Sequence, residues 1–430
     1  MPGEAGKKLQ VMYHYKEVKK PNRFLGKLFL ALCRKYLNYK VKIHIERNDT
    51  EKLVPPYLVL GNHVTYWDPF LVNMFLDEPM CYLAAAVYFR NPILRYFLNS
   101  AGSIPKKKFM THYSPIKRLL KAKENGRILG IFPEGERKWD GTTDEMVFHS
   151  TAKIIKKLNV PVVTVTIKGG YLAYPRWARV SRKGKVNLSY QLCFTKEETQ
   201  RFSLEEIEKR VREQLEHDEV AYQRKTYNRY VGKNLAESLE HLLYICPQCH
   251  SFNSLVSQGN RLTCQKCQYG IIYNQYGFLD AIRKKLYFDN LRDWNRWQNQ
   301  FLRELIVNKI KKHQAKVILE DSLVDILQGT FEDAFQKMGE GRLWLNEKGL
   351  HFTIEEGMKY RFKLEHITGL NVQFHAVLEF NYKEDIFRFH FQNPHISAYK
   401  WVQAIHYAKN EMTMIINKQL EVPRKLDACM

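Results

Sequence analysis

The stretch GNHVTYWDPF, residues 61–70, lies where a predicted strand gives way to a predicted helix. The apolar run 57–60 precedes it, and Pro69 suits the first residue of a helix that Asp68 would cap. His63 then lies in the connecting loop, where its ring can meet the Asp68 carboxylate. A carboxylate that holds one imidazole nitrogen leaves the other free to take a proton, so the pair is typical of a general base acting on a hydroxyl.

The histidine–aspartate pair alone does not decide the chemistry. Aspartates commonly cap helices, and the same spacing therefore also fits a capping Asp68 beside a structural His63. No Ser or Cys in a nucleophile-elbow pattern accompanies the pair. If the pair is catalytic, the expected nucleophile is therefore a hydroxyl of the substrate.

The region around this stretch, from 41 to 200, alternates short apolar runs with helical patterns. This alternation predicts an α/β domain with a mixed, partly parallel sheet. The predicted strands are 41–45, 57–60, 128–132, 160–167 and 186–194, and the predicted helices are 69–76, 112–125 and 150–158.

Three more segments could contribute to a site. ILGIFPEGER, residues 128–137, is a buried strand followed by charged residues, and ligands of α/β folds bind at the carboxyl ends of strands. GSIPKKK, residues 102–108, places three lysines after a turn. These lysines and Arg137 could hold a phosphate, although the lysines alone also fit a solvated loop. VPVVTVTI, residues 160–167, is a buried strand with a scaffolding role.

In this order the four segments resemble the four motif blocks of the glycerolipid acyltransferase family. That family includes glycerol-3-phosphate and 1-acylglycerol-3-phosphate acyltransferases. Asn62, His63 and Asp68 match its first block, Asn-His-x(4)-Asp. FPEGER at 132–137 matches its third block, Phe-Pro-Glu-Gly-x-Arg, and Val-Pro at 160–161 matches the fourth. The resemblance covers under half of the chain.

The resemblance implies a role for each matching residue. His63 would be the base, oriented by Asp68, and an acceptor hydroxyl would attack the thioester of acyl-CoA or acyl-carrier protein. The acceptor would be a lysophospholipid, by default 1-acylglycerol-3-phosphate giving phosphatidate, or glycerol 3-phosphate. Block-two and block-three residues would bind the acceptor phosphate. These substrate-binding residues are Lys108, Glu134, Gly135 and Arg137.

Two departures from the family pattern leave the acceptor open. Block two usually ends in Arg, and Lys108 stands there instead, which keeps the charge but loses the bidentate fork. Block three usually has Thr or Ser before its Arg, and here Glu136 precedes Arg137. A carboxylate next to a phosphate site is unfavourable unless it points away.

The N-terminal region, residues 1–40, is interpreted as a membrane-docking element. A helix over 22–37, capped by Asn22, would carry apolar residues at a three-to-four spacing beside basic ones. Packing of this helix on its own domain fits the same pattern. With no export signal and no apolar run of about 18 residues, we expect a cytoplasmic protein, peripheral on the inner face of a membrane. The residues of the apolar stripe are Leu25, Leu28, Phe29, Leu32 and Tyr36.

Two tight cysteine pairs predict a structural zinc ribbon over residues 244–273. Cys246 and Cys249 are separated from Cys264 and Cys267 by fourteen residues. Four thiolates close the coordination shell, so the metal would hold the fold and perform no catalysis. The segment is too short for its own core, so the metal would supply folding energy. Two disulfides are one alternative, disfavoured in a chain without an export signal. A redox pair is another, although redox CxxC motifs do not usually occur as two matched pairs.

The remaining segments complete the predicted organisation. Charged helical linkers are expected over 201–243 and 274–340. Residues 341–420 show five short alternating strands and a final helix, a pattern similar to a pleckstrin-homology or GRAM-like domain. A dimerisation or packing module is the open alternative for this region.

The composition supports a competing class of function. Lys and Arg total 68 against 45 Asp and Glu, a net charge of +23, which attracts nucleic acid, anionic bilayers or phosphate-bearing substrates. Together with a zinc ribbon and many aromatic residues, this fits a nucleic-acid-binding protein. A lipid-surface scaffold without activity is a third interpretation. Because the motif blocks would then be coincidences, we do not expect nucleic acid as a partner.

Overall fold

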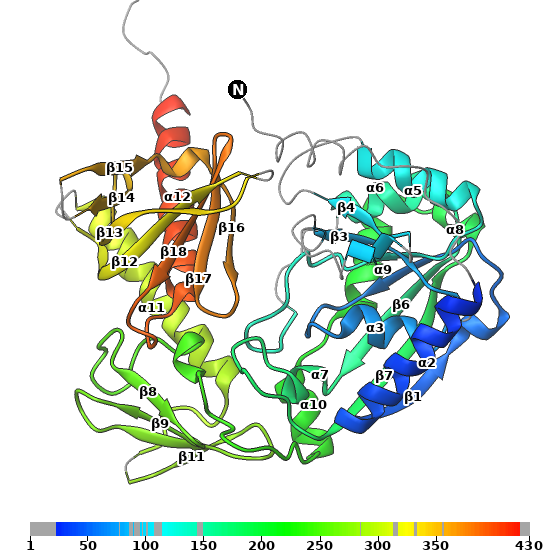
Figure 1. Ribbon diagram of the computed structural model, residues 1–430, viewed down its shortest axis with the longest axis horizontal. Coiled ribbons are helices and arrows are strands. Elements are labelled where there is room, and N and C mark those ends of the chain that lie inside the picture. The colour runs from blue at the N-terminus through cyan, green and yellow to red at the C-terminus, as the bar shows by residue number, and fades with distance from the viewer. Residues whose placement is uncertain are drawn as a thin grey trace, which may run out of the picture.

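The structure is a computed structural model that describes residues 23–421, apart from 77, 86–88, 90–94, 97, 100–101, 107–113, 144–148, 284, 313–316, 331–332 and 355–356. The predicted phosphate ligand Lys108 and the predicted cap Asn22 lie outside the described residues. Figure 1 shows three parts, named here the α/β domain (23–226), the cysteine ribbon (242–281) and the C-terminal module (318–421).

The α/β domain is built on one seven-stranded mixed sheet. All its neighbouring strands run parallel except β6 and β7, so the predicted mixed sheet is confirmed. In order across the sheet the strands are β1 (Lys42–Asn48), β7 (Lys185–Phe194), β6 (Val162–Lys168), β2 (Leu58–Gly61), β5 (Leu129–Ile131), β3 (Cys81–Ala85) and β4 (Ile104–Lys106).

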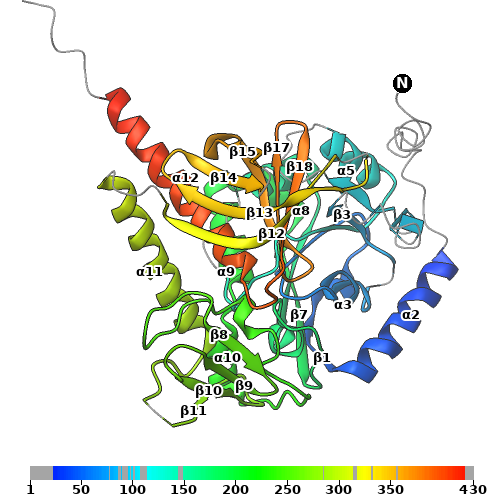
Figure 2. The same cartoon turned by 60° about the vertical axis from the view of Figure 1, so that its left-hand side comes forward.

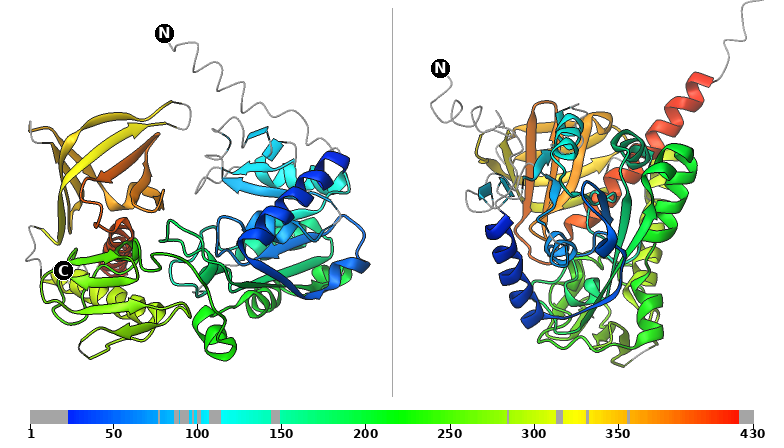
Figure 3. Two further views of the ribbon diagram at one scale, coloured as in Figure 1. Left: turned by 60° about the horizontal axis from the view of Figure 1, so that its bottom comes forward. Right: turned by 90° about the vertical axis from the view of Figure 1, so that its right-hand side faces the viewer.

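Helices cover both faces of this sheet, which explains why its central strands are apolar throughout. All residues of β2 and β5 are buried. On one face pack α5 (Ser114–Glu124), α6 (His149–Leu158) and α9 (Leu204–Leu215), and on the other α2 (Arg23–Lys40) and α3 (Asp68–Asn73). Figure 3 shows the blue helix α2 on one side of the domain and green helices on the other.

The sequence pattern missed two strands and misplaced one helix. Strands β3 and β4 lie at one edge of the sheet, where a strand can carry Pro105 without losing a ladder hydrogen bond. Helix α9 falls in the predicted linker 201–243, but it belongs to the core of the α/β domain. Ile207, Val211 and Leu215 recur every four residues and are buried against the sheet.

Helix α2 confirms the predicted N-terminal helix within the described residues. It packs on the α/β domain through Leu30 and Leu37, which are 6% and 1% exposed. Leu28 and Leu32 of the predicted stripe are 50% and 59% exposed. One side of the helix thus packs on the α/β domain, and the opposite side exposes apolar residues of the predicted stripe. In the described part of the chain, no helix combines the length and the hydropathy needed to span a membrane.

Three further helices belong to this domain. Helix α7 (Gly170–Ala173) lies between β6 and β7, and α8 (Lys196–Arg201) and α10 (Glu219–Thr226) follow β7. The short turn η3 (Leu239–His241) leads into the ribbon. The cysteine ribbon is an antiparallel sheet in the order β11 (Leu279–Ala281), β10 (Gly270–Tyr273), β9 (Arg261–Cys264) and β8 (Leu255–Gln258).

The C-terminal module is a fully antiparallel seven-stranded sheet followed by a long helix, α12 (Ala398–Glu421). In order across the sheet the strands are β15 (Lys359–Phe362), β14 (Gly349–Ile354), β13 (Gln336–Asn346), β12 (Leu319–Gly329), β18 (Asp385–Phe391), β17 (Val377–Tyr382) and β16 (Ile367–Gln373).

The helical prediction for 274–340 is correct only for α11 (Leu291–Lys311) and wrong for β12. A bulge between Asp321 and Val324 explains the error, because it inserts Leu323 with a φ of 55° and shifts the register. The apolar residues on either side of the bulge therefore do not alternate with a period of two. The structured module begins about twenty residues earlier than the predicted boundary at 341.

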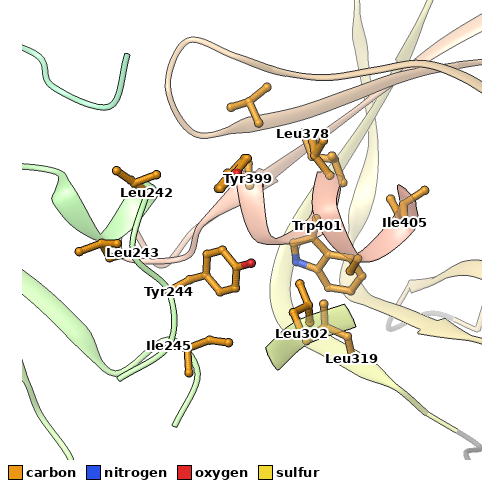
Figure 4. Close-up of a cluster of buried hydrophobic side chains, with 14 of the residues drawn as sticks. Leu242, Leu243, Tyr244, Ile245, Leu302, Leu319, Leu378, Tyr399, Trp401 and Ile405 are labelled. Atoms are coloured by element: carbon orange, nitrogen blue, oxygen red, sulfur yellow. The ribbon is translucent and has the colours of Figure 1, made fainter. Parts of the chain in front are cut away.

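The ribbon, α11 and the C-terminal module share one hydrophobic core. Figure 4 shows Tyr244 and Ile245, which lead into the ribbon, facing Trp401 of α12 and Leu302 of α11. Figure 2 shows α11 and α12 beside each other. The ribbon is therefore not an isolated segment held by metal alone, because its apolar side chains are buried against neighbouring elements.

A buried ion pair within the C-terminal module also binds the ribbon. The Lys400 side chain is 0% exposed, and its Nζ lies 2.6 Å from Asp321 Oδ2 and 2.9 Å from Asn253 Oδ1. Asn253 belongs to the ribbon, and its Nδ2 donates to Asp321 Oδ1 at 2.6 Å. Trp401 Nε1 donates to the same carboxylate at 2.6 Å. Burial lowers the pKa of Lys400, and the Asp321 charge opposes that shift.

We predict that Lys400→Met destabilises the fold by about 3–5 kcal/mol, because it leaves the Asp321 carboxylate buried without its countercharge. Chemical denaturation of the purified protein measures this loss. The double variant Lys400→Met/Asp321→Asn removes both charges and should regain part of it. Lys348→Met, at an exposed position of the same module, is the control. A loss equal to that of the control would show that the pair contributes no stability.

Candidate active site and metal centre

The predicted dyad is formed at the carboxyl end of β2. His63 lies in the loop between β2 and α3, and its Nδ1 is 2.7 Å from Asp68 Oδ2. The Asp68 side chain is 0% exposed, while the His63 ring is 21% exposed. When Nδ1–H donates to the carboxylate, Nε2 keeps its lone pair and can take a proton from a substrate.

The Asp68 carboxylate is bound from several directions, but it does not cap α3. Its Oδ2 also accepts from the backbone N–H of Val64 and of Thr65, at 2.6 and 2.8 Å. Its Oδ1 accepts from the Thr65 hydroxyl at 2.7 Å. The predicted capping role is wrong, since the helix begins at Asp68 itself and Trp67 is its cap residue. The carboxylate instead ties the preceding loop to the helix.

Two further contacts fix the loop that carries His63. Asn62 Oδ1 accepts from the backbone N–H of Ile167 at 2.7 Å, and its Nδ2 donates to the Ile167 carbonyl at 3.1 Å, so the loop is bound to β6. The imidazole stacks on Phe132 with the ring centroids 4.6 Å apart. Asn62 and Phe132 come from the first and third motif segments, so the two segments together orient one ring.

Glu134 supports the histidine loop through a buried side chain. Its side chain is 1% exposed, and Oε1 accepts from the backbone N–H of His63 at 3.0 Å. Its Oε2 lies 3.8 Å from the Lys138 ammonium. The Glu134 carboxylate is therefore not accessible for the predicted substrate contact, and we interpret Glu134 as a residue that positions the backbone of His63.

Gly135 provides a turn. Its φ is +68°, a conformation that residues with a Cβ rarely adopt, and the Cβ position itself would meet no neighbour within 4 Å. The glycine is therefore required by backbone conformation, not by space. Its N–H donates to the Phe132 carbonyl at 3.1 Å, so this group closes the turn. The turn directs the chain from β5 toward Arg137.

Arg137 lies beside the dyad loop, with its guanidinium on the ring of Tyr66. Its guanidinium carbon lies 3.3 Å from the ring centroid of Tyr66, which is 44% exposed. A ring face engages the plane of a guanidinium and leaves its in-plane N–H groups able to bind an anion. Glu136 points away from such an anion, because its Oε2 lies 3.5 Å from Arg176 Nη1. The negative charge of Glu136 is thus balanced by the Arg176 guanidinium.

Some residues of the site have no clear signal in the sequence. Tyr66 lies inside the first motif segment, where its aromatic type was the only indication. Arg176 lies outside the motif segments and donates to the Arg137 carbonyl at 2.6 Å. A pocket lined by Asp140, Tyr171 and Glu219, among others, includes neither dyad residue. The dyad reaches solvent directly through the exposed part of the imidazole.

Comparison with known proteins agrees with this geometry. Residues 40–168 match a family model described as Acyltransferase. Within these residues the chain is similar to acyltransferases, and the match covers less than half of the chain. The matched acyltransferase domain contains His63, Asp68, Glu134, Gly135 and Arg137. No curated protein matches the chain significantly.

Among solved structures, the chain resembles the 1-acyl-sn-glycerophosphate (LPA) acyltransferase PlsC from Thermotoga maritima. The sequence identity is 21%, the TM-score is 0.38, and the alignment covers 50% of this chain and 89% of that chain.

The four predicted metal ligands converge outside the acyltransferase domain. The Sγ atoms of Cys246, Cys249, Cys264 and Cys267 all lie within 4.8 Å of one another. Two of the separations are 3.6 Å, between Cys246 and Cys267, and 3.7 Å, between Cys249 and Cys264. Four thiolates about 2.3 Å from a tetrahedral zinc would lie about 3.8 Å apart. The four residues fit a zinc ion, and all four are free cysteines in the structure.

Hydrogen bonds favour the ionised form that zinc requires at two of the four cysteines, Cys249 and Cys264, whereas burial raises the pKa of Cys246 and Cys267. Burial opposes ionisation of Cys264, but the Ser254 hydroxyl and the N–H groups of Cys267 and Lys266 lower its pKa to about 6. The Ser251 hydroxyl lies 2.9 Å from Cys249 Sγ, and the pKa of Cys249 is likewise lowered although burial opposes it. Such outer contacts orient and tune metal-ligating groups.

The two cysteine pairs occupy equivalent turns. His250 and Gln268, each directly after the second cysteine of a pair, have φ values of 56° and 60°. Their N–H groups donate to the carbonyls of Cys246 and Cys264 at 2.9 Å in both cases. Because four side chains of the protein would fill the coordination shell, the site fits a metal that stabilises the fold.

We predict that the purified protein contains one zinc ion per chain and that Cys264→Ser lowers both zinc content and melting temperature. Elemental analysis and thermal unfolding measure the two effects. Zinc should dissociate as pH falls, because a proton competes with the metal for each thiolate. Cys33→Ser, on α2, is the matched control and should keep its zinc. Full zinc retention by Cys264→Ser would contradict the assignment.

We also predict that Asp68→Asn lowers the turnover number for acyl transfer about 10²–10⁴-fold. An amide presents an N–H₂ group to one of the donors that now converge on the carboxylate, so the imidazole loses the acceptor that fixes its orientation. Steady-state kinetics with acyl-CoA measures the effect. Circular dichroism must show an intact fold, and unchanged turnover would show that Asp68 has no role in the reaction.

Proposed function

We propose that this protein transfers a fatty acyl group from a thioester donor, acyl-CoA or acyl-carrier protein, to the hydroxyl of a lysophospholipid. The default acceptor is 1-acylglycerol-3-phosphate, which would give phosphatidate, and glycerol 3-phosphate is the smaller alternative. The observation that carries this proposal is the His63–Asp68 contact of 2.7 Å at the carboxyl end of β2. The carboxylate is buried and the imidazole is partly exposed, as a proton acceptor requires.

The reaction follows from the free nitrogen of that imidazole. His63 Nε2 takes the proton of the acceptor hydroxyl as its oxygen attacks the thioester carbonyl carbon. A new C–O bond forms, and the carbonyl is restored when the C–S bond breaks. The departing thiolate receives the proton from Nε2, which returns the base to its starting state. Asp68 holds the ring throughout and stabilises the transient imidazolium.

The acceptor phosphate would be bound by Arg137. Its guanidinium lies on Tyr66, in the same loop as the base, so a bound phosphate would be close to the reacting hydroxyl. Guanidinium N–H groups bind phosphate oxygens in a bidentate manner. Lys108, outside the described residues, is proposed as a second cation at this site.

The acceptor and product are lipids, and α2 offers a surface for them. Leu28, Leu32 and Tyr36 are 50%, 59% and 46% exposed and follow one another at a helical spacing. Lys27 and Lys35, on the same helix, are exposed as well. Apolar residues flanked by cations are typical of a helix in the bilayer interface. We propose peripheral attachment to the cytoplasmic face of a membrane through this surface.

The C-terminal module is proposed to be pleckstrin-homology or GRAM-like. Its seven antiparallel strands form one run from β12 to β15 and a second from β16 to β18, and a terminal helix follows them. This arrangement is compatible with that class. This proposal concerns its shape and assigns it no ligand.

The decisive experiment is an in vitro transfer assay that offers glycerol 3-phosphate, 1-acylglycerol-3-phosphate and other lysophospholipids in parallel, each with acyl-CoA and with acyl-carrier-protein donors. We expect transfer to a lysophospholipid and a loss of about 10²–10⁴-fold in His63→Ala, because the base is removed. His149→Ala, which removes an exposed histidine of the same domain, is the control and should remain active. Equal activity of His63→Ala and wild type would exclude His63 as the base.

A further inference from the structure

The hairpin formed by β16 and β17 brings the C-terminal module to the acyltransferase domain. These strands lie on the side of the module that faces that domain (Figure 1). At the hairpin tip, His375 Nδ1 lies 2.7 Å from the Arg176 carbonyl oxygen. The Val372 carbonyl, at the end of β16, accepts from Arg176 Nη2 at 3.4 Å. The contact therefore involves both ends of one arginine.

Arg176 also contacts the third motif segment, residues 128–137. Its side chain is 7% exposed, and Nη1 donates to the Arg137 carbonyl at 2.6 Å. The same nitrogen lies 3.5 Å from Glu136 Oε2, and the guanidinium carbon lies 4.5 Å from the Trp139 ring centroid. Arg176 thus holds the backbone of Arg137 on one side and the hairpin on the other.

A second path reaches the Arg137 side chain. The His375 ring meets the Tyr66 ring edge-on, with centroids 6.0 Å apart and planes at 75°. Tyr66 in turn carries the Arg137 guanidinium on its face at 3.3 Å. The backbone and the side chain of Arg137 are therefore each one residue away from the hairpin.

The tip of the hairpin is held in an unusual conformation. Phe374 and His375 both have a positive φ, 46° and 72°. Non-glycine residues adopt this region at a cost, and they remain there where surrounding contacts determine the conformation. The hydrogen bond of His375 to the acyltransferase domain is such a contact.

The electrostatic environment suits a neutral donor at position 375. Burial lowers the pKa of His375, the hydrogen bond to Arg176 raises it, and the charges of Arg137, Arg179 and Arg176 lower it further. A neutral ring with its proton on Nδ1 makes the observed contact. Such a ring adds no positive charge beside the arginines, so it can lie close to Arg137 without repelling it.

We propose that the β16–β17 hairpin forms part of the acceptor site, and that His375 is a positioning residue that holds Arg137 for the acceptor phosphate. The proposal rests on the proposed function for its consequence in catalysis. His375 contacts neither His63 nor Asp68 through any interaction described above. The hairpin should therefore affect the binding of a phosphate-bearing acceptor more than the proton transfer.

The test uses the full-length protein and three substitutions. His375→Gly removes the imidazole and tolerates the positive φ, so the turn keeps its conformation. His375→Asn also tolerates this φ and retains an N–H donor for the Arg176 carbonyl. His366→Ala removes an exposed histidine elsewhere in the same module and serves as the control.

With 1-acylglycerol-3-phosphate as acceptor, we expect His375→Gly to raise the acceptor KM about 10- to 100-fold while kcat falls much less, because a misplaced binding group weakens binding of the phosphate. His375→Asn should recover part of the loss, and His366→Ala should match wild type. An unchanged acceptor KM in His375→Gly would overturn the proposal, whether or not kcat falls.

Hydrogen exchange on the protein without substrate gives a second reading that needs no turnover. His375→Gly should speed exchange in the segments 64–67 and 135–138, and His366→Ala should not. If wild type transfers no acyl group, the proposed function fails, while the exchange comparison still decides whether the hairpin holds the two segments. Unchanged exchange in His375→Gly would show that it does not.

Discussion

The buried carboxylate of Asp68 is the constraint on which the site depends. Two backbone N–H groups, one hydroxyl and one ring nitrogen point at it: those of Val64 and Thr65, the Thr65 side chain and His63 Nδ1. A carboxylate without exposure must have its oxygens satisfied, and here the partners all come from the loop that carries the base. The loop conformation and the imidazole orientation therefore have one cause.

Local patterns predicted the parts of the fold and site that depend on neighbouring residues. The central strands and the loop position of His63 follow from short apolar runs and from Pro69. Strand β12 was not predicted, because the bulge at Leu323 breaks the alternation of its apolar residues. The contact between Arg176 and His375 was not predicted, because the two residues are 199 positions apart and local periodicity gives no information on such a pairing. The burial of the Glu134 carboxylate was not predicted, because burial cannot be read from a motif.

The chain connects its acyltransferase domain, cysteine ribbon and C-terminal module by buried polar contacts. Asn253 of the ribbon, Asp321 of β12 and Lys400 of α12 form one group in the interior. Such groups are costly unless each charge and hydrogen-bonding atom is paired, so they favour one arrangement of the parts over others. The same arrangement places the β16–β17 hairpin against Arg176. The stability of the ribbon and the position of the β16–β17 hairpin are thus linked through one core.

The central claim is that Asp68 fixes the proton of His63 on Nδ1 and leaves Nε2 as the base. Nitrogen-15 NMR of selectively histidine-labelled protein, with His63 assigned from the spectrum of His63→Gln, tests this directly. Near neutral pH, the account predicts a neutral ring protonated on Nδ1, and loss of that preference in Asp68→Asn. A ring protonated on Nε2, with Nδ1 bare beside the carboxylate, would contradict it, because that nitrogen could then accept no proton from a substrate.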